Sequence, residues 1–410
     1  MSRRAVLLVG LAAGTAAFVL LGMHVTGSLA DVRVYRAGGS AWWHGIPLYT
    51  KEFPSFLPFS YPPAAALLFS VLAAVPLPAA IGVLTAAGLV ALAVTTSFGA
   101  RVAPVFLVAA LLLEPVRETL LFGQVNLVLM GLIAVDCLAR RPSYPRGLLI
   151  GIAAVVKLTP AIFVLFFLVR KQYRAAATAA GTFVAGTALA FVVLPGDSVR
   201  YWTVSVFDAD RVGGAAYATN QSLRGALHRL GITEDIVWPL LVPAVLVLAW
   251  FGARRAADPV IALLVVAAAG LLVSPVSWSH HWVWVVLALA AGLPRWPGVF
   301  FLVGQQFLPR GDDRELAWTW WQHLAGNSYL LVALAFLVWR VVCEQRVDER
   351  AGAGGRTVDA EGLGGRVGAL PDEGQLVGEQ VRVGGAELAG ERAEPVPDPP
   401  LGRDGALVGR

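Results

Sequence analysis

Long apolar runs recur along most of the chain, and this feature limits its possible folds more than any other. The chain has 410 residues, of which 57% are hydrophobic and only 14% are charged, and its mean hydropathy is +0.68. Soluble domains carry roughly 25% charged residues, so this chain is too apolar to be dissolved in water as a whole. A bilayer span needs roughly 17–25 mostly apolar residues. The runs therefore predict an all-α, polytopic integral membrane protein.

The same runs indicate where the membrane helices lie. They cover about residues 5–27, 62–76, 79–98, 103–113, 124–139, 147–169, 175–195, 237–253, 258–274, 280–293, 296–308 and 326–345. The first run follows two arginines and is longer than the apolar part of a signal peptide, so we interpret it as a retained first helix. Because two of the runs are interrupted, we expect about 10–12 crossings in total.

Basic residues indicate on which side of the membrane each connection lies. Arginines flank the apolar runs in short groups, which is typical of the positive-inside rule in a cytoplasmic membrane and not of a nucleic-acid-binding surface. This pattern places both termini in the cytoplasm and the segments 28–61, 196–236, 274–281 and 309–325 outside. Cys137 and Cys343 lie near cytoplasmic helix ends without metal-ligand spacing, so we expect neither a disulfide framework nor a metal site.

Two of the apolar stretches contain residues that interrupt a helix. Lys157 and Pro160 stand in the middle of residues 147–169. Proline removes a helical hydrogen bond and disfavours helical backbone in the residue before it, so we expect two half-helices that meet at a tip. The stretch 103–123 is interrupted similarly, by the Glu-Pro pair that begins at Glu114. Irregular backbone at membrane depth occurs where it is buried in protein or lines a cavity. The sequence does not decide whether each stretch is a full crossing or a re-entrant pair.

The composition changes abruptly after the last apolar run. The segment 346–410 has no aromatic residue and no lysine, and it is rich in Gly, Glu, Arg, Val and Pro. Such a segment cannot bury enough apolar surface to offset the entropy lost on ordering. We therefore expect a membrane domain over residues 1–345 and a disordered cytoplasmic tail over residues 346–410.

Polar residues near the membrane are few, and most lie toward the side predicted to be outside. An ionisable residue at membrane depth is costly and is therefore a candidate for function. The candidates are Asp31, Arg33, Arg36, Glu114, Arg117, Gln124, Asn126, Lys157, Asn220, Gln221, Arg224, His280 and His281. A transporter or lipid flippase would show such residues near the midplane and in repeated halves. No internal repeat is visible, so an enzyme acting at one membrane face is favoured.

Asp31 begins the first outer segment, directly after the first predicted helix. It is either a helix cap at the membrane edge or a general base. A carboxylate in that place can take the proton of a sugar hydroxyl while the oxygen attacks an anomeric carbon. A phosphate leaving group departs without protonation, so no second carboxylate of the kind used in glycoside hydrolysis is needed.

Lys157 is one of three lysines and lies about ten residues from either basic flank of its stretch. That depth makes it hard for the side chain to reach the cytoplasmic interface, which is the common role of such a lysine. A buried phosphate partner is the better interpretation. Arg117 offers a bidentate guanidinium for the same phosphate, although its spacing from Glu114 also fits an ion pair on a helix surface.

Two further groups lie in the outer segments. His280 and His281 are adjacent, so on a helix only one of them faces a given cavity, and we expect that one to bind a sugar hydroxyl, a phosphate or a base. The sequence does not separate the two. Aromatic residues of the first outer loop form either an interfacial aromatic belt or a surface for sugar stacking and lipid entry. They are Tyr35, Trp42, Trp43, Tyr49 and Tyr61.

Six short motifs stand in the order expected of one enzyme family. They are DVRVYRAGGSAWWHGIPLY, FSYPP, LFGQVNLVLM, VVKLTP followed by RKQYR, NQSLRG and SPVSWSHHWVW. Each is weak alone, but together, over about residues 28–285, they resemble the polyprenyl-phosphate-mannose-dependent α-1,2-mannosyltransferases of glycosyltransferase family 87. The resemblance implies a GT-C-type bundle of membrane helices with broken or re-entrant segments.

The resemblance also implies an activity and a set of site residues. Such enzymes move mannose from a polyprenyl-phosphate carrier to a mannolipid or lipoglycan outside the cytoplasmic membrane. The family base corresponds to Asp31 and the family histidine to the segment of His280 and His281. Donor and acceptor contacts correspond to Gln124, Asn126, Lys157, Asn220 and Gln221. We expect no cofactor beyond the carrier-linked donor, and the sequence does not reveal a metal requirement. Transfer of another carrier-linked sugar such as arabinose is an alternative.

Overall fold

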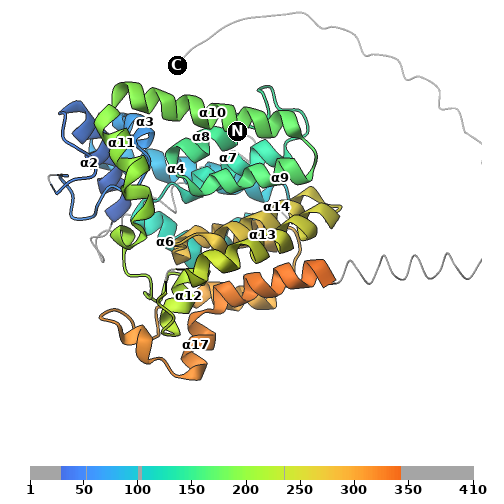
Figure 1. The fold of residues 1–410 in the computed structure, drawn as a ribbon. Coiled ribbons are helices and arrows are strands. Elements are labelled where there is room, and N and C mark those ends of the chain that lie inside the picture. The colour runs from blue at the N-terminus through green and yellow to red at the C-terminus, as the bar shows by residue number, and fades with distance from the viewer. Residues whose placement is uncertain (1–28, 52, 100–103, 235, 343–410) are drawn as a thin grey trace, which may run out of the picture. The chain divides into compact units, whose positions relative to one another are not determined.

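The computed structural model describes residues 29–51, 53–99, 104–234 and 236–342, and within these ranges the regular structure is helical (Figure 1). The first half contains α2 (Ala30–Trp43), α3 (Pro63–Ala73), α4 (Leu77–Thr96), α5 (Pro104–Ala110), α6 (Glu114–Phe122), α7 (Asn126–Leu138), α8 (Leu148–Val156), η1 (Thr159–Phe163), α9 (Val164–Val169) and α10 (Tyr173–Val193). The second half contains α11 (Pro195–Thr203), η2 (Ser205–Phe207), η3 (Ala209–Val212), α12 (Leu223–Arg229), α13 (Val237–Arg255), α14 (Pro259–Val273), η4 (Ser279–Trp284), α15 (Val285–Ala290), η5 (Trp296–Val299), α16 (Phe300–Val303), η6 (Arg314–Ala317), α17 (Trp320–Gly326) and a last helix, Ser328–Val342.

Local sequence explains where several helices begin and end. Proline occupies the first turn of α3, α4, α6 and α14, where its missing N–H has no helical partner to lose. Asp258 caps α14, since its Oδ1 accepts a hydrogen bond from the amide of Val260 at 2.8 Å. Helix α6 ends at Gly123, whose φ of +68° is a left-handed conformation that glycine adopts without strain.

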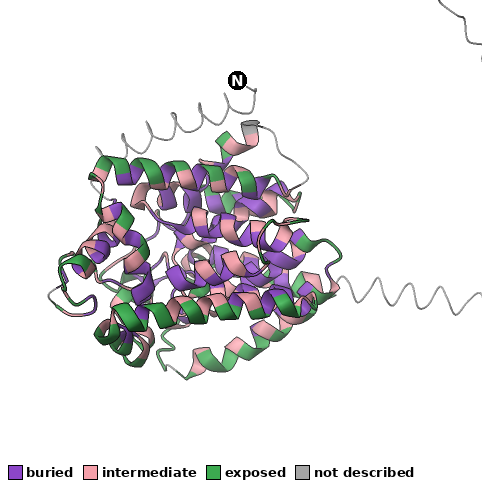
Figure 2. Cartoon of the chain, turned by 90° about the horizontal axis from the view of Figure 1, so that it is seen from above, coloured by how far each residue is buried: buried purple, intermediate pink, exposed green. Residues whose placement is uncertain are grey.

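The helices pack in pairs, some of them neighbours in the chain and others separated by further elements, and small residues let helices approach closely. The main pairs are α2 with α3, α4 with α7, α8 with α10, and α13 with α14. A Cβ atom at Gly39 in α2 would lie 2.7 Å from the backbone of Ser70 in α3, so only glycine fits there. Figure 2 shows exposed residues along the outward faces of the peripheral helices and buried residues toward the interior.

The lengths of the described helices partly match the predicted spans. Three helices, α4, α10 and α13, are long and apolar enough to cross a membrane. Two bent pairs raise this to five if each pair is one span: α6 with α7, bent by 117°, and α17 with the last helix, bent by 70°. The membrane character is therefore confirmed. The predicted 10–12 crossings exceed the number of full-length helices in the described residues, because many of the apolar runs form broken or short helices.

Two sequence predictions differ from the structure, and two lie outside its described residues. The run 296–308 forms only η5 and α16, because Gly304, at φ +69° and ψ −157°, ends the helix, so a crossing there was wrong. The first outer segment was expected to be a loop, but its start forms helix α2. The predicted helix 5–27 and tail 346–410 fall outside the described residues.

Candidate active site

The break at Lys157 is confirmed, and it places a charged side chain among packed helices. Helix α8 ends at Val156, and Lys157 adopts an extended conformation with φ −147° and ψ 131°. Pro160 has no amide hydrogen to continue the helix, and the chain resumes as a 3₁₀ turn and then as α9. The half-buried Lys157 side chain therefore projects from a tip between two half-helices, as the sequence predicted.

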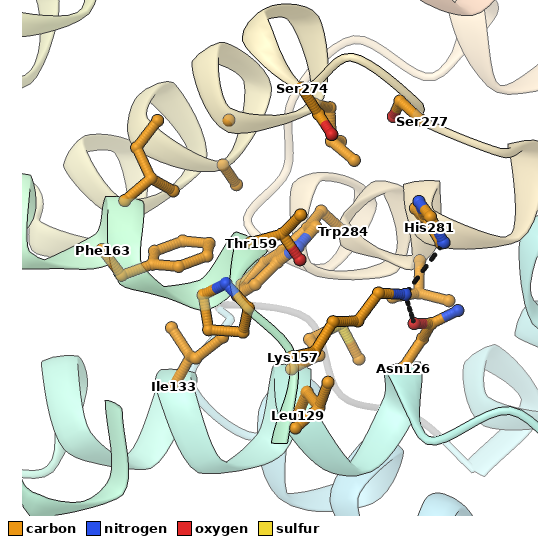
Figure 3. A pocket seen from close by; sticks show the side chains of 17 residues that line it. Asn126, Leu129, Ile133, Lys157, Thr159, Phe163, Ser274, Ser277, His281 and Trp284 are labelled. Atoms are coloured by element: carbon orange, nitrogen blue, oxygen red, sulfur yellow. Dashed lines mark hydrogen bonds between the residues drawn. The ribbon is translucent and has the colours of Figure 1, made fainter. Parts of the chain in front are cut away.

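Two side chains hold the Lys157 ammonium group (Figure 3). Its Nζ donates a hydrogen bond to Asn126 Oδ1 at 3.2 Å and lies 2.9 Å from His281 Nε2. A protonated lysine has only donors, so His281 Nε2 accepts and the imidazole proton belongs on Nδ1. Asn126 stands at the first residue of α7, beside the tight turn at Gly123, so three distant parts of the chain meet at this amine.

A small cavity surrounds this group. Apolar residues of α7, η1, α14 and η4 form much of its wall, and Figure 3 shows the lysine, asparagine and histidine at one end. Its other polar residues are Thr159, Ser274 and Ser277. Sequence reasoning missed these three, since a lone hydroxyl in an apolar run resembles any other. A cation with hydroxyl donors suits a phosphate group.

The structure separates the two adjacent histidines that the sequence could not. His281 faces Lys157 and lines the cavity. His280 is buried, its ring packs against Phe122 at 5.4 Å between centroids, and its Nε2 has no hydrogen-bond partner among the described residues. Its carbonyl oxygen accepts hydrogen bonds from Thr119 Oγ1 at 2.9 Å and Asn126 Nδ2 at 3.0 Å. His281 is therefore the histidine that touches the cavity, and His280 anchors the backbone.

Asp31 lies in the first turn of α2 and joins a network of phenol and amide groups. Its carboxylate is hydrogen-bonded by Gln124 and Tyr61 and interacts electrostatically with Lys157. Tyr35 donates to Gln124 Oε1 at 2.8 Å, and its hydroxyl lies 3.0 Å from that of Tyr61. The predicted base and the predicted phosphate ligand are thus neighbours, although they are far apart in sequence.

The environment of Asp31 changes its acidity. Helix α2 is not one of the candidate membrane-spanning helices of the described residues. Burial raises the pKa of the Asp31 carboxyl to about 6, against the lowering effect of the Gln124 hydrogen bond, the Lys157 charge and the Tyr61 hydrogen bond. A carboxylate with a pKa near neutrality is a better proton acceptor than an ordinary aspartate and is still ionised at pH 7.

Two predicted binding residues hold loops together instead of lining the cavity. Asn220 Oδ1 accepts from the amide of Ser277 at 2.9 Å, and its Nδ2 donates to Ala215 at 3.0 Å. Gln221 Nε2 donates to two carbonyl oxygens, those of Ala218 at 2.8 Å and Gly326 at 2.6 Å. Both side chains are fully buried. They fix the segment of Ser277, which lines the cavity, so their contact with a substrate stays a prediction.

Arg117 lies near Glu114, but the hydrogen bonds of the Glu114 carboxylate come from Ser279, Gln306 and Tyr329. The ion pair on a helix surface therefore also remains a prediction. Arg117 interacts electrostatically with Glu114 and Glu118, and its Nη1 donates to the carbonyl of Leu112 at 3.3 Å. It is not among the residues that line the cavity of Lys157. A phosphate contact by Arg117 therefore remains a prediction.

The predicted aromatic group divides into two classes. The tyrosines Tyr35, Tyr49 and Tyr61 are buried, and Tyr35 stacks on Phe69 at 4.3 Å between ring centroids. Trp43 is 47% exposed and Trp42 is half-buried. The tyrosines therefore belong to the core around Asp31, whereas Trp43 remains available at the surface as an interfacial aromatic.

A second, larger hollow adjoins the cavity. This apolar groove has an empty volume of about 1200 Å³ and is lined by α14, α15, η5 and the last helix. It shares Leu271 and Trp284 with the cavity of Lys157. Its walls are almost entirely apolar, with tryptophans including Trp282 and Trp339. The cavity of Lys157 and the apolar groove are therefore neighbours, with Leu271 and Trp284 lining both.

Comparisons with known proteins identify relatives of this chain. The chain is 39% identical to a polyprenol-phosphate-mannose-dependent α-(1-2)-phosphatidylinositol mannoside mannosyltransferase of Mycobacterium tuberculosis, over 81% of this chain and 88% of the relative. It is 41% identical to the protein of the same name from Mycolicibacterium smegmatis, over 75% and 82%. An α-(1→3)-arabinofuranosyltransferase of Corynebacterium glutamicum is 29% identical over 52% and 53%.

No solved structure matches the chain. The model of glycosyltransferase family 87 matches residues 59–275, a range that includes Tyr61, Gln124, Asn126 and Lys157. With that match and relatives of about 40% identity over most of its length, this chain belongs to glycosyltransferase family 87, a family of membrane enzymes.

Proposed function

We propose that this enzyme transfers mannose from a polyprenyl-phosphate carrier to a hydroxyl group of a phosphatidylinositol mannoside, forming an α-1,2 linkage. The names of the relatives that are 39% and 41% identical support the donor, the acceptor and the linkage. A related mannolipid or lipoglycan would present the same type of hydroxyl group. The positive-inside pattern and the predicted sides of the helices support an active site at the outer face of the cytoplasmic membrane.

The observation that carries this proposal is the position of Lys157. Its ammonium group lies at the end of a cavity whose wall continues into an apolar groove. A polyprenyl-phosphate sugar has the matching order of parts, namely a long apolar chain, one anionic phosphate and a polar sugar. Placing the phosphate at Lys157 and the chain in the groove directs the sugar toward the remaining side, where the electrostatic neighbour is Asp31.

The site residues account for each atom of the transfer. Asp31 accepts the proton of the acceptor hydroxyl, while that oxygen forms a bond to the anomeric carbon of mannose. The bond between this carbon and the phosphate oxygen breaks, with inversion, and the electron pair leaves on the phosphate. Lys157 stabilises the added negative charge, and the proton on Asp31 passes to solvent. No cofactor is needed, because the phosphate bond of the donor supplies the leaving group.

Product analysis tests the proposal. Membranes with and without this protein are given labelled polyprenyl-phosphate mannose and phosphatidylinositol mannoside, and the labelled lipids are separated and digested with an α-1,2-mannosidase. We expect a new labelled mannolipid that the mannosidase removes. The absence of any transfer, or transfer only from carrier-linked arabinose, would contradict the proposal, and the second outcome would favour the arabinosyltransferase alternative.

The role of Lys157 is tested with a matched pair of lysines. Lys157→Ala should lower kcat/KM for the donor by about 10²-fold, because one charge-stabilising donor at a developing anion contributes roughly that much. Lys171→Ala is the control, since Lys171 is exposed at the far end of the same broken stretch. If Lys157→Ala changed only the KM for the acceptor, or if both variants behaved alike, the phosphate role would be wrong.

A further inference from the structure

Glu114 is a buried acid that the transfer reaction does not use. It is fully buried at the first residue of α6. Its Oε1 accepts a hydrogen bond from Ser279 Oγ at 2.6 Å and a weaker one from Gln306 Nε2 at 3.4 Å. Its Oε2 accepts from the Tyr329 hydroxyl at 2.9 Å. One carboxylate thus joins four separate parts of the chain, and burying it without those donors would be costly.

The packing around Glu114 is built for a side chain of this shape. Gly304 has φ +69°, and a Cβ atom there would lie 2.9 Å from Glu114 Cγ and 3.0 Å from its Cδ. Any larger residue at position 304 would be strained by its backbone and would also press on the carboxylate. The turn that ends α16 therefore accommodates Glu114 instead of continuing as a helix.

One of the three hydrogen bonds to Glu114 leads toward the cavity. Ser279 is the first residue of η4, and His280 and His281 follow it. The next residue, His280, is held through its carbonyl by Thr119 of α6 and Asn126 of α7. Two residues after Ser279, His281 Nε2 lies 2.9 Å from Lys157 Nζ. Helices α6 and α7 therefore form hydrogen bonds with η4 at two successive residues, Ser279 and His280, directly before His281.

We propose that Glu114 is a positioning residue, which fixes the start of η4 through Ser279 and thereby sets where His281 holds Lys157. This inference rests on the proposed function, since Lys157 is taken to bind the donor phosphate. Glu114 touches neither substrate nor the reacting atoms. A short 3₁₀ helix has poorer hydrogen-bond geometry than an α-helix and depends more on side-chain anchors of this kind.

The test compares two hydroxyl groups on the same carboxylate. Ser279→Ala removes the bond that leads to η4, and Tyr329→Phe removes the bond that leads to the last helix. Both variants lose one hydroxyl, so a merely structural role predicts similar effects on activity and similar falls in Tm. We expect Ser279→Ala to raise the KM for the carrier-linked donor about tenfold with little change in the KM for the acceptor. We expect Tyr329→Phe to keep the donor KM within about twofold.

A double-mutant cycle gives the second readout. If Ser279 acts through His281, then Ser279→Ala should change the donor KM much less in a His281→Ala background than in the native enzyme. Additive effects, or equal donor KM values for Ser279→Ala and Tyr329→Phe, would overturn the inference while the native enzyme still transfers mannose. If the native enzyme does not transfer mannose from the carrier, the proposed function fails instead, and the two failures are thereby distinguished.

Discussion

Asp31 and Glu114 are two acids that lie near the same cavity but in opposite kinds of surroundings. Asp31 is half-buried in the first turn of α2, with Gln124 and Tyr61 as hydrogen-bond donors and Lys157 as a nearby cation. Glu114 is fully buried, and its donors come from elements far apart in the chain. Asp31 is only half-buried and interacts electrostatically with Lys157. Both oxygens of Glu114, by contrast, accept hydrogen bonds from protein side chains.

The difference shows how similar side chains acquire different roles. A general base must exchange a proton during the reaction, so it needs access to substrate and a pKa near the working pH. A carboxylate that accepts several internal hydrogen bonds holds its donors in place and has little capacity left for a substrate. In the sequence both residues are simply acids near the membrane, and only their partners in the structure distinguish the proposed base, Asp31, from the proposed positioning residue, Glu114.

The largest predicted effect is the fall in kcat when the charge of Asp31 is removed, and removal of the Glu114 charge should have a smaller effect. Asp31→Asn should lower kcat by about 10³-fold or more, since general base catalysis contributes roughly 10²–10⁴-fold. Glu114→Gln keeps the shape of the side chain and should lower kcat/KM for the donor by less than about tenfold. Transfer assays with equal amounts of membrane-inserted protein measure both. Near-native transfer by Asp31→Asn would contradict the base role of Asp31.

The pH dependence should follow Asp31 and not Glu114. The pKa of the Asp31 carboxyl is raised to about 6, and only the ionised form accepts a proton. The rate should therefore be steady above about pH 7 and fall about tenfold for each unit below pH 6. A pH profile of kcat in the native enzyme and in Glu114→Gln should show the same acidic limb. A limb near pH 4, the range of an ordinary aspartate, would contradict the raised pKa.

A smaller effect is expected for the phenol beside Asp31. The hydrogen bond from Tyr61 lowers the pKa of that carboxyl, so Tyr61→Phe should move the acidic limb to higher pH, by a fraction of a unit, and lower the rate at pH 6 about twofold. Tyr35→Phe is the matched control, because Tyr35 bonds to Gln124 and Tyr61 and is not hydrogen-bonded to Asp31. Equal shifts in both variants would show that the network acts as a unit and not through Tyr61 alone.

Much of the site was predictable because its chemistry is rare in a membrane. Lys157 stood out as a charge deep in an apolar stretch next to a proline, and the structure confirms the broken helix there. Asp31 stood out as an acid at the membrane edge. The motif around Gln124 and Asn126 was placed near Lys157 by the family resemblance, and Asn126 does contact it at 3.2 Å.

Other parts were not predictable because neutral residues give no such signal. Ser279 and Tyr329 look like ordinary residues of apolar helices, yet both bind Glu114. Asn220 and Gln221 look like substrate ligands, yet their buried side chains tie loops together. The run 296–308 is apolar enough for a crossing, but the close approach of Gly304 to Glu114 ends the helix early.

The sequence by itself determined that this chain lies in a membrane as a set of helices, because apolar composition and basic flanks act locally, through the cost of placing each residue in lipid or in water. It also indicated the family to which the chain belongs and supplied the candidates for the reactive groups. The tertiary structure alone decided which histidine faces Lys157 and which of the two acids interacts with that lysine. Those choices depend on contacts among α2, α6, α7, α8 and η4, which lie as many as about 250 residues apart, and no local pattern records such contacts.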